Sequence, residues 1–369
     1  MPVHNRIADA ALHLTEWRRD LHAHPELGFE EHRTSAIVAE KLESWGITVT
    51  RGIAGTGLVG TLRAGTSARA IGLRADMDCL EMTEANDFAH RSTTPGRMHA
   101  CGHDGHTTML LGAAQYLAET RNFDGTVHFI FQPAEEGGGG GRVMVEEGLF
   151  DRFPCDMVFG AHNDTSLPIG TLQAATGQVS AASDRFWIHI TGRGGHAARP
   201  HQTIDPVAQA VLSITQFHAG STGNVIAGGA SLNGTVRTLD PAVQDMIEAA
   251  MHDTVAGIAS AQGATAVLEY ERGYPSVFNA ADPTLRVGAA ADRLLGAGHF
   301  ISQAPVMMGG EDFSYMAQKV PGCFVRIGQR DGDRFGVSVH NPLYDFNDDI
   351  LPIGASFWAT LVEQELPRE

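Results

Sequence analysis

Cysteine is scarce in this 369-residue sequence, which has only four, at positions 79, 101, 155 and 323. Secreted proteins that depend on disulfides usually carry many more cysteines in a shorter chain. No disulfide framework is therefore indicated. In a reducing compartment, a cysteine that lies near histidines is instead a candidate metal ligand or nucleophile.

Positive charge is also in short supply, with 26 Lys and Arg against 43 Asp and Glu and a formal net charge of −17. An acidic surface repels nucleic-acid phosphates and anionic lipid headgroups. We therefore expect no nucleic-acid partner and no membrane association. The same charge also fits an ordinary, well-solvated surface.

Long apolar runs are missing as well. No run reaches the roughly 20 residues that span a bilayer. Residues 1–14 have the pattern of an amphipathic helix and lack the continuous apolar core of a secretion signal. We expect a cytoplasmic protein.

The order of helix and strand patterns predicts an α/β protein with two domains. In the first part of the chain, helices are expected at 30–45 and 106–119, and strands at 57–63, 70–76, 125–132 and 155–162. A β-α-β-α-β pattern follows, with helices at 205–218 and 240–261 that each begin with Asp-Pro. We predict one domain of residues 1–180 plus 293–369, interrupted by a smaller α+β domain of residues 181–292.

The segment HACGHDGH places Cys101 two residues before His103 on a glycine-rich turn. Thiolate and imidazole are ligands that zinc prefers, and glycine lets the backbone turn tightly enough for both to face one cavity. Two further histidines lie in the segment, and not all of them need be ligands. The alternative is a buried structural cysteine beside unrelated histidines.

Two adjacent carboxylates, Glu135 and Glu136, follow the strand expected at 125–132. Sites in open α/β sheets lie at the carboxyl ends of strands. Two carboxylates that point in different directions can divide metal binding from proton transfer. The alternatives are a solvated acidic turn or a phosphate loop, but the glycines at 137–141 are not followed by the Gly-Lys-Ser/Thr of such a loop.

Single polar residues complete the candidates. His162 ends another expected strand and His340 follows a strand-like segment, but either could be structural when taken alone. Asp76 and Asp78 follow an apolar strand, where a carboxylate could orient a metal-binding histidine. His196 lies in the glycine turn GRGGHAARPH, so it is either free to reach a ligand or a loop residue without a role.

Together these motifs resemble the dinuclear zinc aminoacylase and carboxypeptidase family. The closest branch contains hippurate hydrolase, indole-3-acetyl-amino-acid hydrolase and N-acetyl-diaminopimelate deacetylase. The matching segments, in chain order, are RRDLHAHPELGFEE, RADMD, HACGHDGH, QPAEEGGGG, GAHN, GGHAARPHQTIDPV, NVI, GTVRT, MGGEDFSYM and VHNP. No single segment is decisive, but their number and order make the resemblance specific.

The resemblance implies a zinc-peptidase-like catalytic domain with a mixed sheet and an inserted lid domain that also forms a homodimer. It implies two divalent metal ions per subunit, with Zn²⁺ as the first choice and Mn²⁺, Co²⁺ or Ni²⁺ as alternatives. The branch's ligand positions fall on Cys101, His103, Glu136, His162 and His340. Cys101 matches the ligand that bridges the two ions.

The implied reaction is hydrolysis of an N-acyl amino acid, such as an N-acetyl or N-benzoyl derivative, by a metal-bound hydroxide. Glu135 matches the general base that also passes the proton to the leaving amine. His196 matches a lid histidine that stabilises the oxyanion. Asn224 and Arg237 are candidates for binding the substrate carboxylate, which a guanidinium can grip bidentately. For Arg237, the alternative is a structural ion pair.

The chain departs from the family at several positions. Arg74 stands where other branches carry a histidine, so Asp76 is expected to support the ligands without binding metal itself. The lid's usual proline is replaced by Ala227. Glu81 and Asp164 add negative charge to two loops, which suggests the hypothesis that a polar or cationic amino-acid side chain is accepted.

Three other interpretations stay open. They are a dipeptidase or carboxypeptidase with the same chemistry, a metal-binding protein without catalysis, and a cysteine hydrolase that uses Cys101. A protein that only stores a metal needs no general base, so the presence of Glu135 argues against a metal-binding protein without catalysis. A cysteine hydrolase would survive chelation, whereas a metal-dependent enzyme would not.

Overall fold

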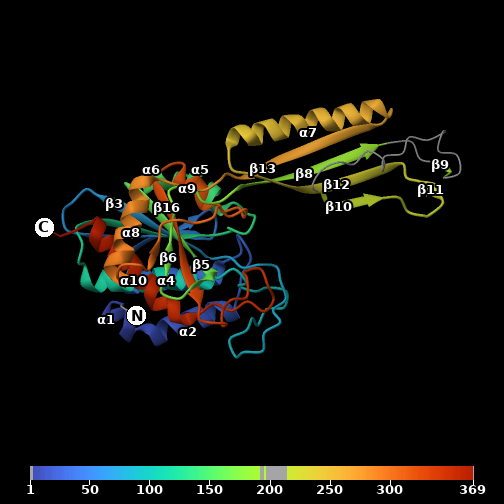
Figure 1. Cartoon of the computed structure of the whole chain (residues 1–369). Coiled ribbons are helices and arrows are strands. Elements are labelled where there is room, and N and C mark those ends of the chain that lie inside the picture. Colours follow the sequence, from blue (N-terminus) through green and yellow to red (C-terminus); the bar gives the residue numbers. More distant parts are fainter. Residues whose placement is uncertain (1–2, 192–194, 197–213, 369) are drawn as a thin grey trace. The chain divides into compact units, whose positions relative to one another are not determined.

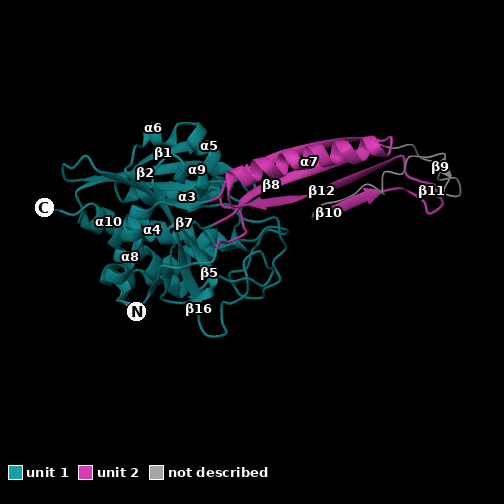
Figure 2. Ribbon diagram, turned by 45° about the horizontal axis from the view of Figure 1, so that its top comes forward, with its two compact units in different colours: residues 1–179, 277–305, 312–369 teal, residues 180–276, 306–311 magenta. Residues whose placement is uncertain are grey.

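The computed structural model describes residues 3–191, 195–196 and 214–368. The chain forms two compact units (Figure 2): unit 1 comprises residues 1–179, 277–305 and 312–369, and unit 2 comprises residues 180–276 and 306–311. Residues 277–292, which the sequence assigned to the inserted domain, belong to unit 1. The reason is that α8 (Ala281–Leu295) packs against α10 (Leu351–Glu365) and β16 (Gly322–Arg330) of that unit.

Unit 1 is built on an eight-stranded sheet, which is mixed, as predicted. In spatial order its strands are β1 (Thr48–Ile53), β2 (Gly57–Ala64), β4 (Gly125–Gln132), β3 (Ala70–Asp76), β5 (Met157–Pro168), β16, β6 (Leu172–Gln173) and β15 (Phe300–Ile301). The central strands β4, β3, β5 and β16 are parallel, whereas β1 and β2 pair antiparallel. Strands β3 and β4 have the predicted bounds. A short antiparallel pair, β7 (Gly177–Gln178) and β14 (Phe278–Asn279), completes the strands of unit 1.

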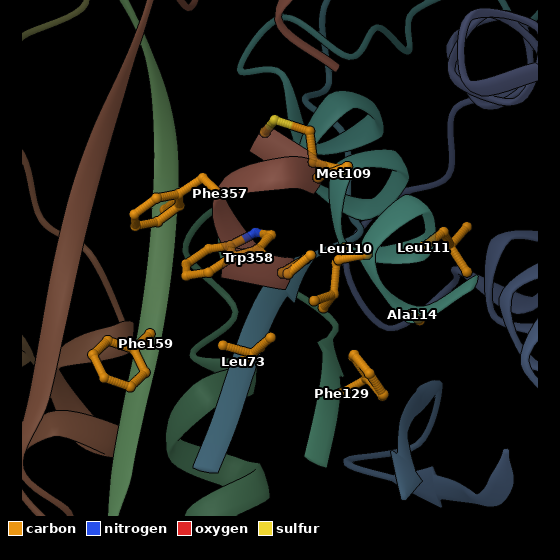
Figure 3. Close-up of a cluster of buried hydrophobic side chains, with 14 of the residues drawn as sticks. Leu73, Met109, Leu110, Leu111, Ala114, Phe129, Phe159, Phe357 and Trp358 are labelled. Atoms are coloured by element: carbon orange, nitrogen blue, oxygen red, sulfur yellow. The ribbon is translucent and has the colours of Figure 1, made fainter. Parts of the chain in front are cut away.

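Helices cover this sheet, and its core lies between them and the central strands. The helices besides α8 and α10 are α1 (Asn5–Asp9), α2 (Ala11–Ala23), α3 (His32–Ser44), α4 (His103–Thr120), α5 (Gly140–Glu146), α6 (Leu149–Arg152) and α9 (Phe313–Ala317). Figure 3 shows Leu73 of β3 and Phe129 of β4 beside Leu110 of α4 and Trp358 of α10, all of them buried. Every residue of β3 is buried, including the polar Arg74 and Asp76 at its carboxyl end, so the strand lacks the alternation of a half-exposed strand.

In its described residues, unit 2 has a four-stranded antiparallel sheet and one long helix (Figure 1). The strands, in spatial order, are β10 (Ile214–Ala219), β12 (Gly229–Thr238), β8 (Ala182–Thr191) and β13 (Thr265–Tyr274). Helix α7 (Pro241–Ala261) packs on one face of this sheet, against residues such as Phe186 and Leu232. Asp240 caps α7 by accepting from the Ala242 N–H at 2.8 Å, which confirms the start predicted from Asp-Pro.

The helix predicted at 205–218 is wrong in the part that the structure describes. Residues 214–218 lie in β10, which pairs with β12 through Gln216 opposite Asn233 and His218 opposite Ser231. Pairing with a strand that is distant in sequence therefore outweighs the local helical pattern. Residues 205–213 lie outside the described part of the chain.

Among the described residues, no helix combines the length and the apolar character needed to cross a membrane.

Candidate metal centre

The candidate site lies in unit 1, next to the carboxyl ends of β3 and β4. Three or more potential ligand atoms come within 4.8 Å of one another in overlapping groups: Cys101–His103–His162, Cys101–Glu136–His340, His103–Glu135–Glu136 and Asp76–His103–His106. All five predicted ligands and Glu135 are thus brought together. The sequence placed His162 at the end of a strand, but β5 continues beyond it to Pro168.

Cys101 and His162 face each other, with Sγ and Nε2 3.2 Å apart. The His162 Nδ1–H donates to the Asn163 carbonyl at 2.7 Å, which leaves Nε2 directed at the thiol. Burial lowers the pKa of His162 to about 3, and burial together with Glu136 and Glu135 raises the pKa of Cys101 well above its usual value. A bound cation would oppose the shift at Cys101, because it favours the thiolate.

His103 carries the clearest signature of a metal ligand. Its Nδ1–H donates to Asp78, with the carbonyl oxygen at 2.9 Å and Oδ1 at 3.1 Å. Its Nε2 is buried and has no hydrogen-bond partner among the described residues. Burial alone would lower the pKa of His103, but Asp76 and Asp78 raise it to about 10. An imidazole held by a carboxylate, with its other nitrogen unpaired, fits a divalent cation.

Glu136 and His340 form the other side of the cluster, with Oε1 and Nε2 3.0 Å apart. This contact raises the pKa of His340. The backbone of His340 has a left-handed φ of 61°, and its N–H donates to the Ala100 carbonyl at 2.8 Å. The residue before Cys101 therefore holds His340 beside the cluster, at a position that disfavours non-glycine residues.

The sequence named Asp76 as the residue that supports the ligands, but the hydrogen bonds to His103 Nδ1 and to the Glu136 backbone come from Asp78. Asp78 supports two candidate ligands, since its Oδ2 also accepts the backbone N–H of Glu136 at 2.9 Å. Asp76 instead accepts from His106 Nδ1 and Arg74 Nη1, both at 2.6 Å, and its Oδ2 lies 3.8 Å from His103 Nε2. Burial would raise the pKa of Asp76, but His103 and Arg74 hold it well below its usual value.

A buried ionic network lies beside these residues, centred on Arg74. Besides Asp76, its guanidinium donates to Gln132 at 2.8 Å and to Asp312 at 3.0 Å. The other oxygen of Asp312 accepts the Gly141 N–H at 2.8 Å. Asp312 belongs to the MGGEDF segment, and the sequence did not predict its role because its partners are distant in the chain.

Residues 72–364 match the peptidase family M20/M25/M40. The chain belongs to this family. Its M20 relatives include IAA-amino acid hydrolase ILR1-like 2 of Arabidopsis thaliana, with 37% identity over 95% of this chain and 85% of the relative. Hippurate hydrolase of Campylobacter jejuni is 36% identical over 93% of this chain and 94% of that protein.

The M20 fold is also seen in a solved structure. The YXEP protein of Bacillus subtilis, described as a dinuclear metal binding peptidase from the M20 family, superimposes with a TM-score of 0.85. It is 34% identical, and the match covers 97% of this chain and 99% of that one. The family resemblance inferred from the motifs is therefore confirmed.

The predicted site residues of unit 2 are only partly covered by the described residues. The backbone of His196 forms β9 (Gly195–His196) and pairs with Val225 of β11 (Val225–Ile226), but its side chain lies outside the described residues. Asn224 is exposed, and its Oδ1 accepts from the Thr222 hydroxyl at 3.3 Å. Arg237 is also exposed, and its hydrogen bonds go to the carbonyl oxygens of Met308 and Val236.

The two acidic loop residues differ in their surroundings. Asp164 forms an ion pair with Arg326 at 3.3 Å, so its charge is compensated. Glu81 is exposed.

Proposed function

We propose that this M20 protein is a metal-dependent amidohydrolase that cleaves the amide bond of N-acyl amino acids. The observation that carries the proposal is the position of Glu135, whose carboxylate lies within 4.8 Å of the ligand atoms of His103 and Glu136. A base next to a complete donor set suits hydrolysis better than metal storage. Two relatives, hippurate hydrolase and IAA-amino acid hydrolase, are named as hydrolases of acylated amino acids.

The donor set fits two divalent ions. Cys101 lies within 4.8 Å of His103 and His162 and also of Glu136 and His340, so it would serve both parts of the donor set. The buried Nε2 of His103, which has no hydrogen-bond partner among the described residues, suits a cation. The proposed ligands are Cys101, His103, Glu136, His162 and His340. Thiolate and imidazole donors favour Zn²⁺, with Mn²⁺, Co²⁺ or Ni²⁺ as alternatives. When bound, the ions would polarise the scissile carbonyl and lower the pKa of a water molecule.

The chain's own residues would move protons and hold the substrate. Glu135, which is buried, would take a proton from the attacking water and deliver it to the leaving amine. We assign stabilisation of the oxyanion to His196 and binding of the substrate carboxylate to Asn224 and Arg237, on the family resemblance.

We also propose that unit 2 acts as a lid and forms a homodimer. Light scattering coupled to gel filtration would test the homodimer.

A substrate panel tests the reaction. Metal-quantified protein is assayed with N-acetyl and N-benzoyl amino acids beside dipeptides of the same residues. We expect turnover of the acyl amino acids, loss of activity after chelation, and recovery with Zn²⁺, Mn²⁺ or Co²⁺. Activity on dipeptides alone would favour the peptidase interpretation, and activity that survives chelation would favour a cysteine hydrolase.

Cys101→Ser tests the ligand set without relying on activity. We expect the variant to bind fewer metal ions per chain, because a hydroxyl is a poorer ligand than a thiolate. Cys155→Ser is the control, since Cys155 is a free cysteine that belongs to none of the ligand groups. Unchanged metal content in Cys101→Ser would remove this residue from the site.

A further inference from the structure

The loop that carries Glu135 is held by three carboxylates from distant parts of unit 1. The donors are the backbone N–H groups of Ala134, Glu136 and Gly141, and the acceptors are Glu31 at 2.8 Å, Asp78 at 2.9 Å and Asp312 at 2.8 Å. All three carboxylates are buried. Asp78 and Asp312 also serve the histidine and arginine networks, whereas Glu31 has no contact with a proposed ligand among its described hydrogen bonds.

This loop needs to be held because it combines a strained residue with a run of glycines. Ala134, the residue before Glu135, has a left-handed φ of 52°, which a non-glycine residue adopts at an energetic cost. The glycines at 137–141 follow, and glycine has the largest conformational freedom of any residue. An added Cβ at Gly28 would come within 2.9 Å of the Ala134 Cβ, so the segment leading to Glu31 packs directly on this position.

Glu31 has both the position and the charge needed to fix this loop. It closes the RRDLHAHPELGFEE segment, to which the proposed reaction assigns no role. One oxygen accepts the Ala134 N–H, and the other accepts the Thr56 hydroxyl at 2.5 Å, so the carboxylate is fixed on both sides. Burial raises the pKa of Glu31 to about 6, and the group is therefore ionised at pH 8. A charged acceptor makes the stronger kind of hydrogen bond to a backbone N–H.

We propose that Glu31 is a positioning residue for the general base: it holds Ala134 in the left-handed conformation that places Glu135 beside His103 and Glu136. The inference rests on the proposed function, because it takes Glu135 as the base. Small displacements of a catalytic group are costly, and a shift of about 1 Å can reduce turnover roughly 100-fold. Glu31 would thus support Glu135 without touching the reacting atoms.

The test compares Glu31→Gln with Glu30→Gln at pH 8. Glutamine keeps the size of Glu31 but offers one oxygen for two donors and no charge. Glu30 is the matched control, since it is the neighbouring residue, is exposed and pairs with Arg97 at the surface. For each variant we measure bound metal, kcat and KM, and the hydrogen exchange of backbone amides at residues 134–141.

We expect Glu31→Gln to retain its metal and its KM within about twofold, while kcat falls about tenfold. Exchange in residues 134–141 should be about tenfold faster, because the Ala134 N–H loses its charged acceptor. Glu30→Gln should match the unmodified protein in all readouts. Glu31→Gln with the kcat or the loop exchange of Glu30→Gln would overturn the proposal.

Glu135→Gln separates this inference from the proposed function. Near-normal turnover in Glu135→Gln would remove Glu135 as the base, and the exchange measurement would still show whether Glu31 holds the loop. Loss of activity in Glu135→Gln together with no effect of Glu31→Gln would reject the positioning role alone.

Discussion

The two units differ in how deeply their polar residues are buried. In unit 1, β3 is buried at every position, and it carries a fully buried arginine and aspartate that are satisfied by other buried groups. In unit 2, β8 alternates between buried and more exposed residues, because α7 covers only one face of its sheet. Deep burial gives unit 1 fixed donors and a low local dielectric, which is where metal and proton chemistry gain most from pre-organisation.

The described part of unit 2 offers few such groups. Its core cluster is small, and Asp184 is the centre of its buried polar contacts, accepting from Gln244, Tyr270 and Gly273. Its candidate substrate contacts, Asn224 and Arg237, are exposed side chains. Substitutions in unit 1 are therefore expected to act on the reaction or on buried charge, whereas most substitutions in unit 2 are expected to be tolerated.

The largest effect is expected from Glu135→Gln in unit 1. Removal of a general base typically costs about 10²- to 10⁴-fold in turnover, and the neutral glutamine leaves the metal ligands in place. We expect kcat to fall in this range with unchanged metal content, measured on the same preparation. Glu146→Gln, an exposed carboxylate paired with Arg142, should behave as the unmodified protein. Near-normal turnover in Glu135→Gln would refute its assignment as the base.

Arg74→Met tests the cost of breaking buried charge in the same unit. The change leaves Asp76 and Asp312 buried without their cation, and we expect the free energy of unfolding to fall by about 3–5 kcal/mol. Peptide-resolved hydrogen exchange in urea measures this for unit 1 separately from unit 2. Arg142→Met breaks an exposed pair with Glu146 and should cost less than about 1 kcal/mol. Equal effects of the two substitutions would contradict the importance of burial.

Asp184→Ala is the corresponding test in unit 2. The variant leaves the Tyr270 hydroxyl, the Gln244 amide and the Gly273 N–H without their shared acceptor, and we expect a loss of about 2–3 kcal/mol. Faster hydrogen exchange should be confined to peptides of unit 2. Asp245→Ala, at an exposed residue paired with Arg272, is the control. Faster exchange throughout unit 1 would show that the two units do not unfold separately.

The smallest effect is expected at the surface of α7. Met246 is exposed, so Met246→Gln should change the free energy of unfolding by less than about 0.5 kcal/mol. Thermal unfolding and peptide exchange would measure it. A larger loss would show that another surface covers Met246 in solution, for example in the proposed homodimer.

Local patterns predicted much of the fold. The bounds of β3 and β4 followed from short apolar runs that end in polar residues, and the start of α7 followed from Asp240 and Pro241. The strand at 214–219 was missed, because it depends on pairing with a strand that lies after it in the chain. The sequence of residues 214–219 alone does not indicate which strand they pair with.

The candidate site could be predicted as a set of residues but not as a set of contacts. Motif order pointed to the donors that the structure brings together. The separate roles of Asp76 and Asp78 depend instead on which histidine each one reaches, because Asp78 contacts His103 and Asp76 contacts His106. The three backbone contacts of the Glu135 loop were also invisible in the sequence, because residues 31, 78 and 312 are remote from it.

The interruption of unit 1 by unit 2 has a consequence for synthesis on the ribosome. Strand β5 pairs with β16, so one edge of β5 stays unpaired until residues 322–330 have been translated. Helix α10, which supplies Phe357 and Trp358 to the core, emerges later still. Residues 180–276, which form most of unit 2, are translated between β5 and β16. The nascent chain therefore carries an open sheet edge for a long interval, which is when a holding chaperone would be most useful.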